Sequence, residues 1–96
     1  MRSPRDRSIE AVARRTREQL DQAARDTQRL AVEQVRRWNR DYSLREIAVV
    51  LGVSTSTTHR WVTAQAWPGL QLAQDLLRRA DLLSRNLNHN REVNDR

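Results

Sequence analysis

The sequence predicts an all-α fold, and three observations support that prediction. Residues 8–39 contain neither glycine nor proline and are rich in Arg, Glu, Gln and Ala, which favour helix. Apolar residues recur there, and again after residue 69, at steps of three and four, the period of an amphipathic helix. Between these segments, Ser43 and Gly52 stand where a helix start and a helix end are expected. We therefore expect a long N-terminal helix, a helix-turn-helix core and a leucine-rich C-terminal helix.

The first expected helix covers residues 8–40, as an arm followed by the first helix of the core. Residues 1–7 are polar and are expected to be disordered, with Ser8 as the N-cap. About 32 helical residues would span about 48 Å, whereas a compact chain of this length has a radius of gyration of about 12–13 Å. The helix must overhang, break or lie along another subunit, which favours a homodimer. Its apolar positions, thin at first and larger near the end that should meet the core, are Ile9, Val12, Ala13, Thr16, Leu20, Ala23, Thr27, Leu30, Ala31, Val32, Val35 and Trp38.

Residues 41–66 carry the most specific pattern, SLREIAVVLGVSTSTTHRWV. Ser43 and Glu46 have the spacing of a capping box, in which each side chain bonds to the other residue's backbone amide. Gly52 can supply the left-handed conformation of a tight turn, and Ser54 is the expected cap of a second helix. That helix is expected to run to about residue 64 or 65. The apolar positions that would form a small core between the two helices are Leu44, Ile47, Ala48, Leu51, Val53, Trp61 and Val62.

This segment resembles the helix-turn-helix of the homeodomain-like superfamily, found in resolvase/invertase-type recombinases, insertion-element transposases and many small bacterial regulators. The resemblance covers residues 43–64, under a quarter of the chain, and rests on the pattern S-L-R-E-I-A…L-G-V-S…S-T…R-W. Thr58 departs from the family, which usually has Val or Ile at this inward position. A threonine hydroxyl there can bond a carbonyl one turn back.

The resemblance implies that the outward face of the second helix contacts double-stranded DNA, through Thr55, Ser56, His59, Arg60 and Thr63. Arg60 can bind guanine O6 and N7 with two hydrogen bonds, and Thr55 and Ser56 suit a phosphate or a thymine methyl. The alternative is that the hydroxyls only cap and solvate the helix, and that Arg60 pairs with an acid. Four further arginines suit either backbone phosphates or a solvated face: Arg36, Arg37, Arg40 and Arg45.

Residues 67–88 are expected to form the C-terminal helical segment. Trp67-Pro68-Gly69 ends the preceding helix, because proline disfavours helix at the residue before it, and one helix then runs from about Leu70 to Leu87. Residues 89–96 are polar and are expected to be disordered. The tryptophans Trp38, Trp61 and Trp67 could stack on single-stranded bases, but their positions favour packing in the core. The apolar face of this helix contains Leu70, Leu72, Ala73, Leu76, Leu77, Ala80, Leu82, Leu83 and Leu87.

Composition favours a nucleic-acid partner and disfavours an enzyme. The chain has 18 basic and 12 acidic residues, a net charge of +6, and its basic residues are all arginines. It has no Cys and two His, so no disulfide and no metal set is expected. The sequence contains no glycine-rich phosphate loop, no evident cofactor or small-molecule site, and no apolar run of membrane-spanning length. A cytoplasmic, nucleoid-associated protein is the expectation.

These observations predict a sequence-specific binder of double-stranded DNA, acting as a bacterial, phage or plasmid regulator or as an accessory factor in recombination or segregation. Dimerisation through the long first helix or the last helix would read an inverted repeat with half-sites about 10 bp apart, or a multiple of that. Two alternatives stay open. One is an oligomeric adaptor or assembly protein that works through its long helices. The other is non-specific chromosome coating, with a steep salt dependence.

Overall fold

The computed structural model describes residues 4–94 and places the side chains of residues 8–93. The described chain has five α-helices and no strand, which confirms the all-α prediction with a long N-terminal helix. Residues 1–3 and 95–96, which belong to the segments expected to be disordered, lie outside the described residues. The helices are α1 (Pro4–Trp38), α2 (Leu44–Leu51), α3 (Thr55–Val62), α4 (Leu70–Arg78) and α5 (Ala80–Asn94).

Both ends of the chain are more helical than the sequence indicated. The first helix begins at Pro4 rather than after Ser8, because proline is tolerated in a first helical turn, where its missing N–H would have no partner. The last helix continues through residues 89–94 instead of ending at Asn88. Contacts distant in sequence hold it there. The Asn88 side chain accepts a hydrogen bond from the Tyr42 hydroxyl at 3.3 Å, and Arg91 lies over the Tyr42 ring.

The single C-terminal helix expected over residues 67–88 is divided at Arg79. This residue has φ −103° and ψ 13°, and both it and Arg78 form ion pairs with Asp75. The division has a tertiary cause, because α4 packs along α1 whereas α5 packs against α2. One straight helix could not follow both. No glycine or proline marks the position, so the sequence carried no sign of it.

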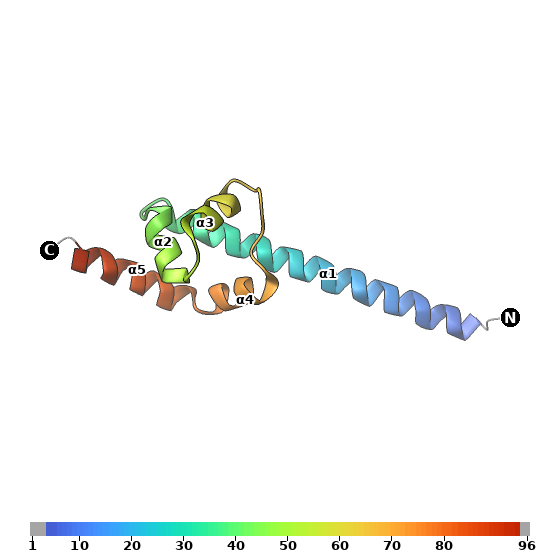
Figure 1. The fold of residues 1–96 in the computed structure, drawn as a ribbon. Coiled ribbons are helices and arrows are strands. Elements are labelled where there is room, and N and C mark those ends of the chain that lie inside the picture. Colours follow the sequence, from blue (N-terminus) through green and yellow to red (C-terminus); the bar gives the residue numbers. More distant parts are fainter. Residues whose placement is uncertain (1–3, 95–96) are drawn as a thin grey trace.

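The molecule is a small helical body with a long overhanging helix (Figure 1). α1 runs from the N-terminal end into the body, α2 to α5 gather around its C-terminal half, and α5 continues to the opposite end of the structure. The principal extents are 75 × 25 × 19 Å, and the radius of gyration is 18.9 Å, against about 12–13 Å for a compact chain of this length. A helix of this length was expected to overhang the body, to break or to lie along another subunit. In the single chain it overhangs the body.

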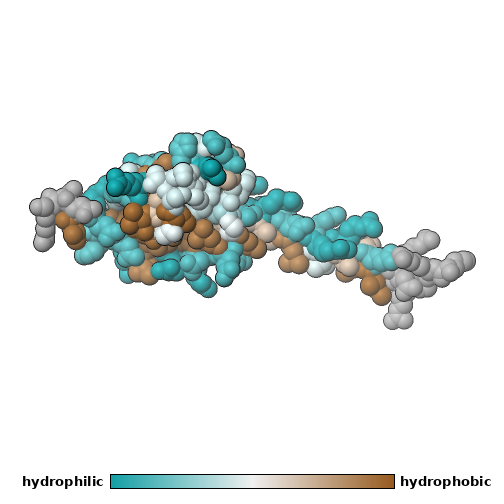
Figure 2. Space-filling view, in the orientation of Figure 1, coloured by the Kyte–Doolittle hydropathy of each residue, from teal (hydrophilic) through white to brown (hydrophobic). Residues whose placement is uncertain are grey.

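Apolar side chains remain exposed along that overhang, and Figure 2 shows them as brown patches on one edge of it. Ile9, Leu20 and Leu30 are 63%, 64% and 53% exposed, and Val12 is also exposed. Leu30 was expected to meet the core, and that expectation is wrong. The helical period turns it away from the body, while Val32, Val35 and Trp38 reach the core from the same helix.

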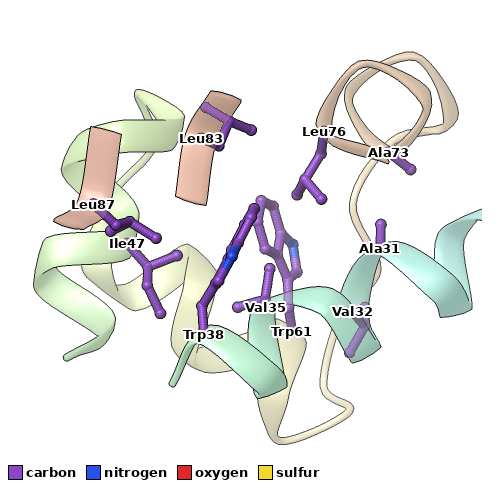
Figure 3. Packing of buried hydrophobic residues seen from close by; sticks show 10 residues of the cluster. All are labelled: Ala31, Val32, Val35, Trp38, Ile47, Trp61, Ala73, Leu76, Leu83 and Leu87. Atoms are coloured by element: carbon purple, nitrogen blue, oxygen red, sulfur yellow. The ribbon is translucent and has the colours of Figure 1, made fainter. Parts of the chain in front are cut away.

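The core forms where α1, α2, α3, α4 and α5 converge. Figure 3 shows the indoles of Trp38 and Trp61 in the middle of it, and both side chains are buried. Trp67, also expected in the core, is 52% exposed. Its neighbour Pro68 is buried instead, and the Pro68 carbonyl accepts a hydrogen bond from Gln28 Nε2 at 2.9 Å, which fixes this connection on α1. The buried cluster consists of Ala31, Val32, Val35, Trp38, Ile47, Trp61, Ala73, Leu76, Leu83 and Leu87.

Candidate nucleic-acid interface

The start of α2 and its turn into α3 follow the sequence prediction. The Ser43 hydroxyl accepts from the Glu46 amide at 3.1 Å, and the Glu46 carboxylate accepts from the Ser43 amide at 3.2 Å, so the capping box is confirmed. Gly52 is left-handed, with φ 72°, and ends α2. The amide of Val53 then donates to the Ala48 carbonyl at 3.0 Å, which draws the chain into the tight turn.

The start of α3 is also confirmed, but its end is not. The Ser54 hydroxyl accepts from the Thr57 amide at 3.1 Å as the N-cap. The helix ends at Val62, before the expected residue 64 or 65, because Ala64 adopts a left-handed conformation with φ 60°. Gln65 then donates its amide to the Arg60 carbonyl at 2.8 Å, as in other left-handed helix ends.

The inward face of α2 and α3 holds the pair at a fixed angle against the body. Ile47 and Ala48 of α2, and Thr58 and Trp61 of α3, are buried. The Thr58 hydroxyl donates to the Thr55 carbonyl at 2.7 Å, which is the bond to the preceding turn that the sequence suggested for this residue. The hydroxyl is therefore satisfied although the side chain is fully buried.

The five candidate residues, four on α3 and Thr63 at its C-cap, face away from this core. Thr55, Ser56, His59, Arg60 and Thr63 are exposed. α3 itself contains no acidic residue. Within residues 8–93, the Arg60 guanidinium has no ion pair or side-chain hydrogen bond, so the alternative in which it pairs with an acid is not what this fold contains. An unpaired guanidinium at an exposed helix surface is free to bind a base edge or a phosphate.

Local hydrogen bonds separate these candidates into two groups. The Thr63 hydroxyl donates to the His59 carbonyl at 2.8 Å, and the Ser56 hydroxyl shares a hydrogen bond with Ser54 at 3.2 Å. Both hydroxyls therefore already have a partner in the helix. The side chains of Thr55, His59 and Arg60 form no hydrogen bond within the part of the chain that the structure places, so they have the most capacity left for a ligand.

The four flanking arginines occupy two places. Arg36, Arg37 and Arg40 surround one shallow hollow at the end of α1, together with Glu33. Arg45 lines a separate hollow beside Val49 and Leu87 of α2 and α5. The structure thus brings three of the four together, and all four are exposed.

Arg36 has a contact that sequence reasoning missed. Its Nε and Nη2 atoms donate to the carbonyl of Val62, the last residue of α3, at 3.3 and 3.1 Å. The arginine thereby ties the end of α1 to the end of α3, where helix carbonyls lack partners and a positive charge is favourable. The two residues are 26 positions apart, so no local pattern could have indicated the contact.

The first residues of α2 are held by the last helix. Arg91 Nη2 lies 3.3 Å from Glu46 Oε1, and the Arg91 guanidinium lies 4.2 Å from the centre of the Tyr42 ring. The pKa of Glu46 is lowered chiefly by the hydrogen bond from the Ser43 amide. Burial opposes this effect, and the contacts with Arg91 and with the Ser43 hydroxyl lower the pKa further. This carboxylate therefore serves as a helix cap and as the anchor of α5.

Charge on α1 is concentrated near the body. Residues 8–27 contain four arginines and four acids, so their net charge is zero. Residues 28–40 contain four arginines and one acid, a net charge of +3. The positive end of α1 is the end that joins α2 and contacts α3. Electrostatic attraction to a polyanion would therefore act beside the candidate residues and not along the overhang.

Other kinds of site find little support in the described chain. Residues 8–93 contain no group of three or more His, Cys, Asp or Glu side chains placed to hold a metal ion. None of the helices formed by residues 4–94 combines the length and the apolar composition that a membrane crossing requires. Comparison with family models, with curated proteins and with solved structures finds no match for this chain, so its function has to be argued from its own geometry.

Proposed function

We propose that this protein binds double-stranded DNA by placing α3 in the major groove. The proposal rests on the arrangement of α2 and α3, two short helices joined by a tight turn and packed on a third. An α-helix fits the major groove of B-DNA, and its exposed side chains can then reach the base edges. The sequence resemblance to the homeodomain-like helix-turn-helix points to the same function.

The observation that carries the proposal is the guanidinium of Arg60, which is exposed, has no partner within residues 8–93 and lies on a helix without acidic residues. A guanidinium can donate two hydrogen bonds to O6 and N7 of guanine, the commonest specific contact in protein–DNA complexes. Thr55, five residues earlier and exposed, suits a phosphate or a thymine methyl. Because α3 contains no acidic side chain, no carboxylate on this helix would repel the DNA phosphates.

Arginines beside α3 would add the non-specific part of the binding energy. Arg37 and Arg40 are exposed at the positively charged end of α1. Arg36 retains a guanidinium N–H that its two bonds to Val62 do not use. Contacts of this kind fix a protein on the phosphate backbone and make its affinity depend on salt.

Selection from a random duplex library at about 150 mM salt tests the proposal, because non-specific electrostatic binding is weakened at that ionic strength. We expect one short sequence to be enriched. Arg60→Ala should then weaken binding to it by about 1–3 kcal/mol and relax the preference at one base pair. Arg14→Ala removes the same charge from the overhang and is the matched control. If both variants lose the same affinity on every sequence, Arg60 contributes only its positive charge and reads no base. If the selection enriches no sequence, the proposal is wrong.

A second function, as an adaptor or assembly protein, is favoured by the overhang of α1. Its apolar side chains lie exposed beyond the body, where they make no contact with the core of their own chain. The library selection separates the two functions, because an adaptor would enrich no sequence. An adaptor would instead bind a specific protein partner, and its affinity for that partner would not depend on DNA sequence.

A further inference from the structure

We infer that the overhang of α1 is the seam of a coiled coil formed with a second copy of this chain. The seam consists of the side chains that follow one line along the overhang. This inference does not depend on DNA binding, because it concerns a different surface and can be tested without DNA. The seam residues are Ile9, Ala13, Thr16, Leu20, Ala23, Thr27 and Leu30.

The spacing of the seam residues is that of a heptad repeat. Their sequence intervals alternate between four and three from Ile9 to Leu30, a mean of about 3.5 residues per turn. A straight helix has 3.6 residues per turn, so a line with this period drifts slowly around the helix. Two helices follow such a line together by winding into a left-handed supercoil. Packing on a flat surface of an unrelated protein does not require this period.

The two threonines in the seam present an apolar surface. Thr16 Oγ1 donates to the Val12 carbonyl at 2.9 Å, and Thr27 Oγ1 donates to the Ala23 carbonyl at 2.9 Å. Because both hydroxyls are satisfied within α1, their burial against another helix would leave no polar group without a partner. The alanines and threonines between the larger side chains allow two helices to approach closely.

The charge of the overhang is compatible with a second copy. Residues 8–27 have a net charge of zero, although the whole chain carries +6. Two copies that pair along this segment therefore avoid the repulsion that pairing along residues 28–40, with a net charge of +3, would create. A neutral arm is also poorly suited to follow a phosphate backbone.

The exposed area of the chain is sufficient for such a dimer. The chain exposes 7379 Å², whereas a compact monomer of 11.3 kDa exposes about 5,700 Å². The excess of about 1,600 Å² per chain is about twice the 800 Å² that each partner buries in an interface of standard size. The overhang contributes to this excess, so the chain exposes more surface than an ordinary interface requires.

Sedimentation equilibrium of the full chain, without DNA, tests this inference over about 1–200 µM, the range in which moderate protein affinities are measured. We expect a reversible monomer–dimer equilibrium. Leu20→Glu places a charge in the middle of the seam and should weaken the dimer at least tenfold. Gln22→Glu adds the same charge to an exposed position off the seam and is the matched control, expected to leave the equilibrium unchanged.

Two further measurements keep the result interpretable. The buried Trp38 and Trp61 lie in the body, so their fluorescence shows whether a variant retains its fold. An apolar seam of zero net charge should also associate equally well at about 0.1 M and 0.5 M salt, because screening acts on charges. A wild-type chain that stays monomeric throughout, or a Leu20→Glu variant that dimerises like the wild type, would overturn the inference.

Discussion

The guanidinium of Arg36 donates two hydrogen bonds to the carbonyl of Val62, at 3.3 Å from Nε and 3.1 Å from Nη2. This contact joins the last turn of the long helix to the last residue of α3. Its position matters because α3 is short and its end is closed by Ala64 in a strained conformation. The orientation of the candidate recognition helix therefore depends in part on a side chain from another helix.

Arg36→Ala should lower the free energy of unfolding by about 1 kcal/mol, because it removes hydrogen bonds from a charged donor and a favourable charge at a helix C-terminus. Arg37→Ala is the matched control, since Arg37 is also exposed and forms no ion pair or side-chain hydrogen bond within residues 8–93. Urea denaturation followed by circular dichroism measures both. Equal stability of the two variants would show that the contact to Val62 contributes nothing to the fold.

Ala64→Gly should stabilise the protein by about 0.5–1 kcal/mol. Ala64 has φ 60°, a conformation that costs a residue with a Cβ about 1–2 kcal/mol, and glycine avoids this cost while losing some chain entropy on folding. Gln65→Gly, in the same connection but without positive φ, should destabilise instead. Thermal unfolding of the two variants gives the sign of each effect. A destabilised Ala64→Gly would mean that chain entropy outweighs the strain.

Ser84→Ala should destabilise the core by about 1–2 kcal/mol, because it leaves a buried donor without a partner. Trp38 Nε1 donates to Ser84 Oγ at 2.8 Å, and Trp38 is only 5% exposed. A double-mutant cycle with Trp38→Phe isolates this hydrogen bond from the loss of indole volume. Urea denaturation by circular dichroism suits the cycle, since tryptophan fluorescence changes with the mutation. Additive losses in the double variant would show that the bond does not stabilise the fold.

Glu46 should make stability depend on pH in the acidic range. Its pKa is lowered in the folded chain, mainly by the Ser43 amide and then by Arg91. The extra stability is therefore complete above the ordinary glutamate pKa of about 4.3, and it is lost as the pH falls through the lower pKa of the folded state. Glu46→Gln should give a shallower loss of stability on acidification. Arg91→Met should do the same to a smaller extent.

Unfolding midpoints measured at several pH values between about 6 and 2.5 test this expectation. That range covers both the ordinary glutamate pKa and the region below it. If Glu46→Gln and the wild type lose stability in parallel, the acid sensitivity of the fold comes from other carboxylates. Asp75 is the next candidate, because its pKa is also lowered, first by the hydrogen bond from Arg78 and then by Arg79.

The parts of the fold that depend on neighbouring residues could be predicted from the sequence. The capping box of Ser43 and Glu46, the left-handed Gly52 and the cap at Ser54 each depend on side chains within a few positions. Once these fixed the start of α3, its period of 3.6 residues placed Arg60 on the outward face. The candidate site could therefore be located without the structure, although its contact with DNA stays a prediction.

The parts that depend on distant contacts could not be predicted. Ala64 is left-handed without being glycine, and the break at Arg79 follows from the different packing of α4 and α5. Trp67 is exposed because Pro68, not the tryptophan, is buried beside Gln28. In each case the sequence pattern indicated the conformation or burial that one residue prefers. The packing of several helices determined the conformation or burial that it adopts.

The core also determines how the chain should open. Its buried side chains come from residues 31–87, on both sides of α2 and α3, so this pair lies between the helices that stabilise it. Amides from about residue 31 to Arg91 should therefore exchange their hydrogens together, through unfolding of the whole body. Amides of the overhang have only their own helix to protect them and should exchange much faster in a single chain. Deuterium uptake along α1 should then change abruptly near Gln28, which makes the chain one folding unit with a helical extension of separate stability.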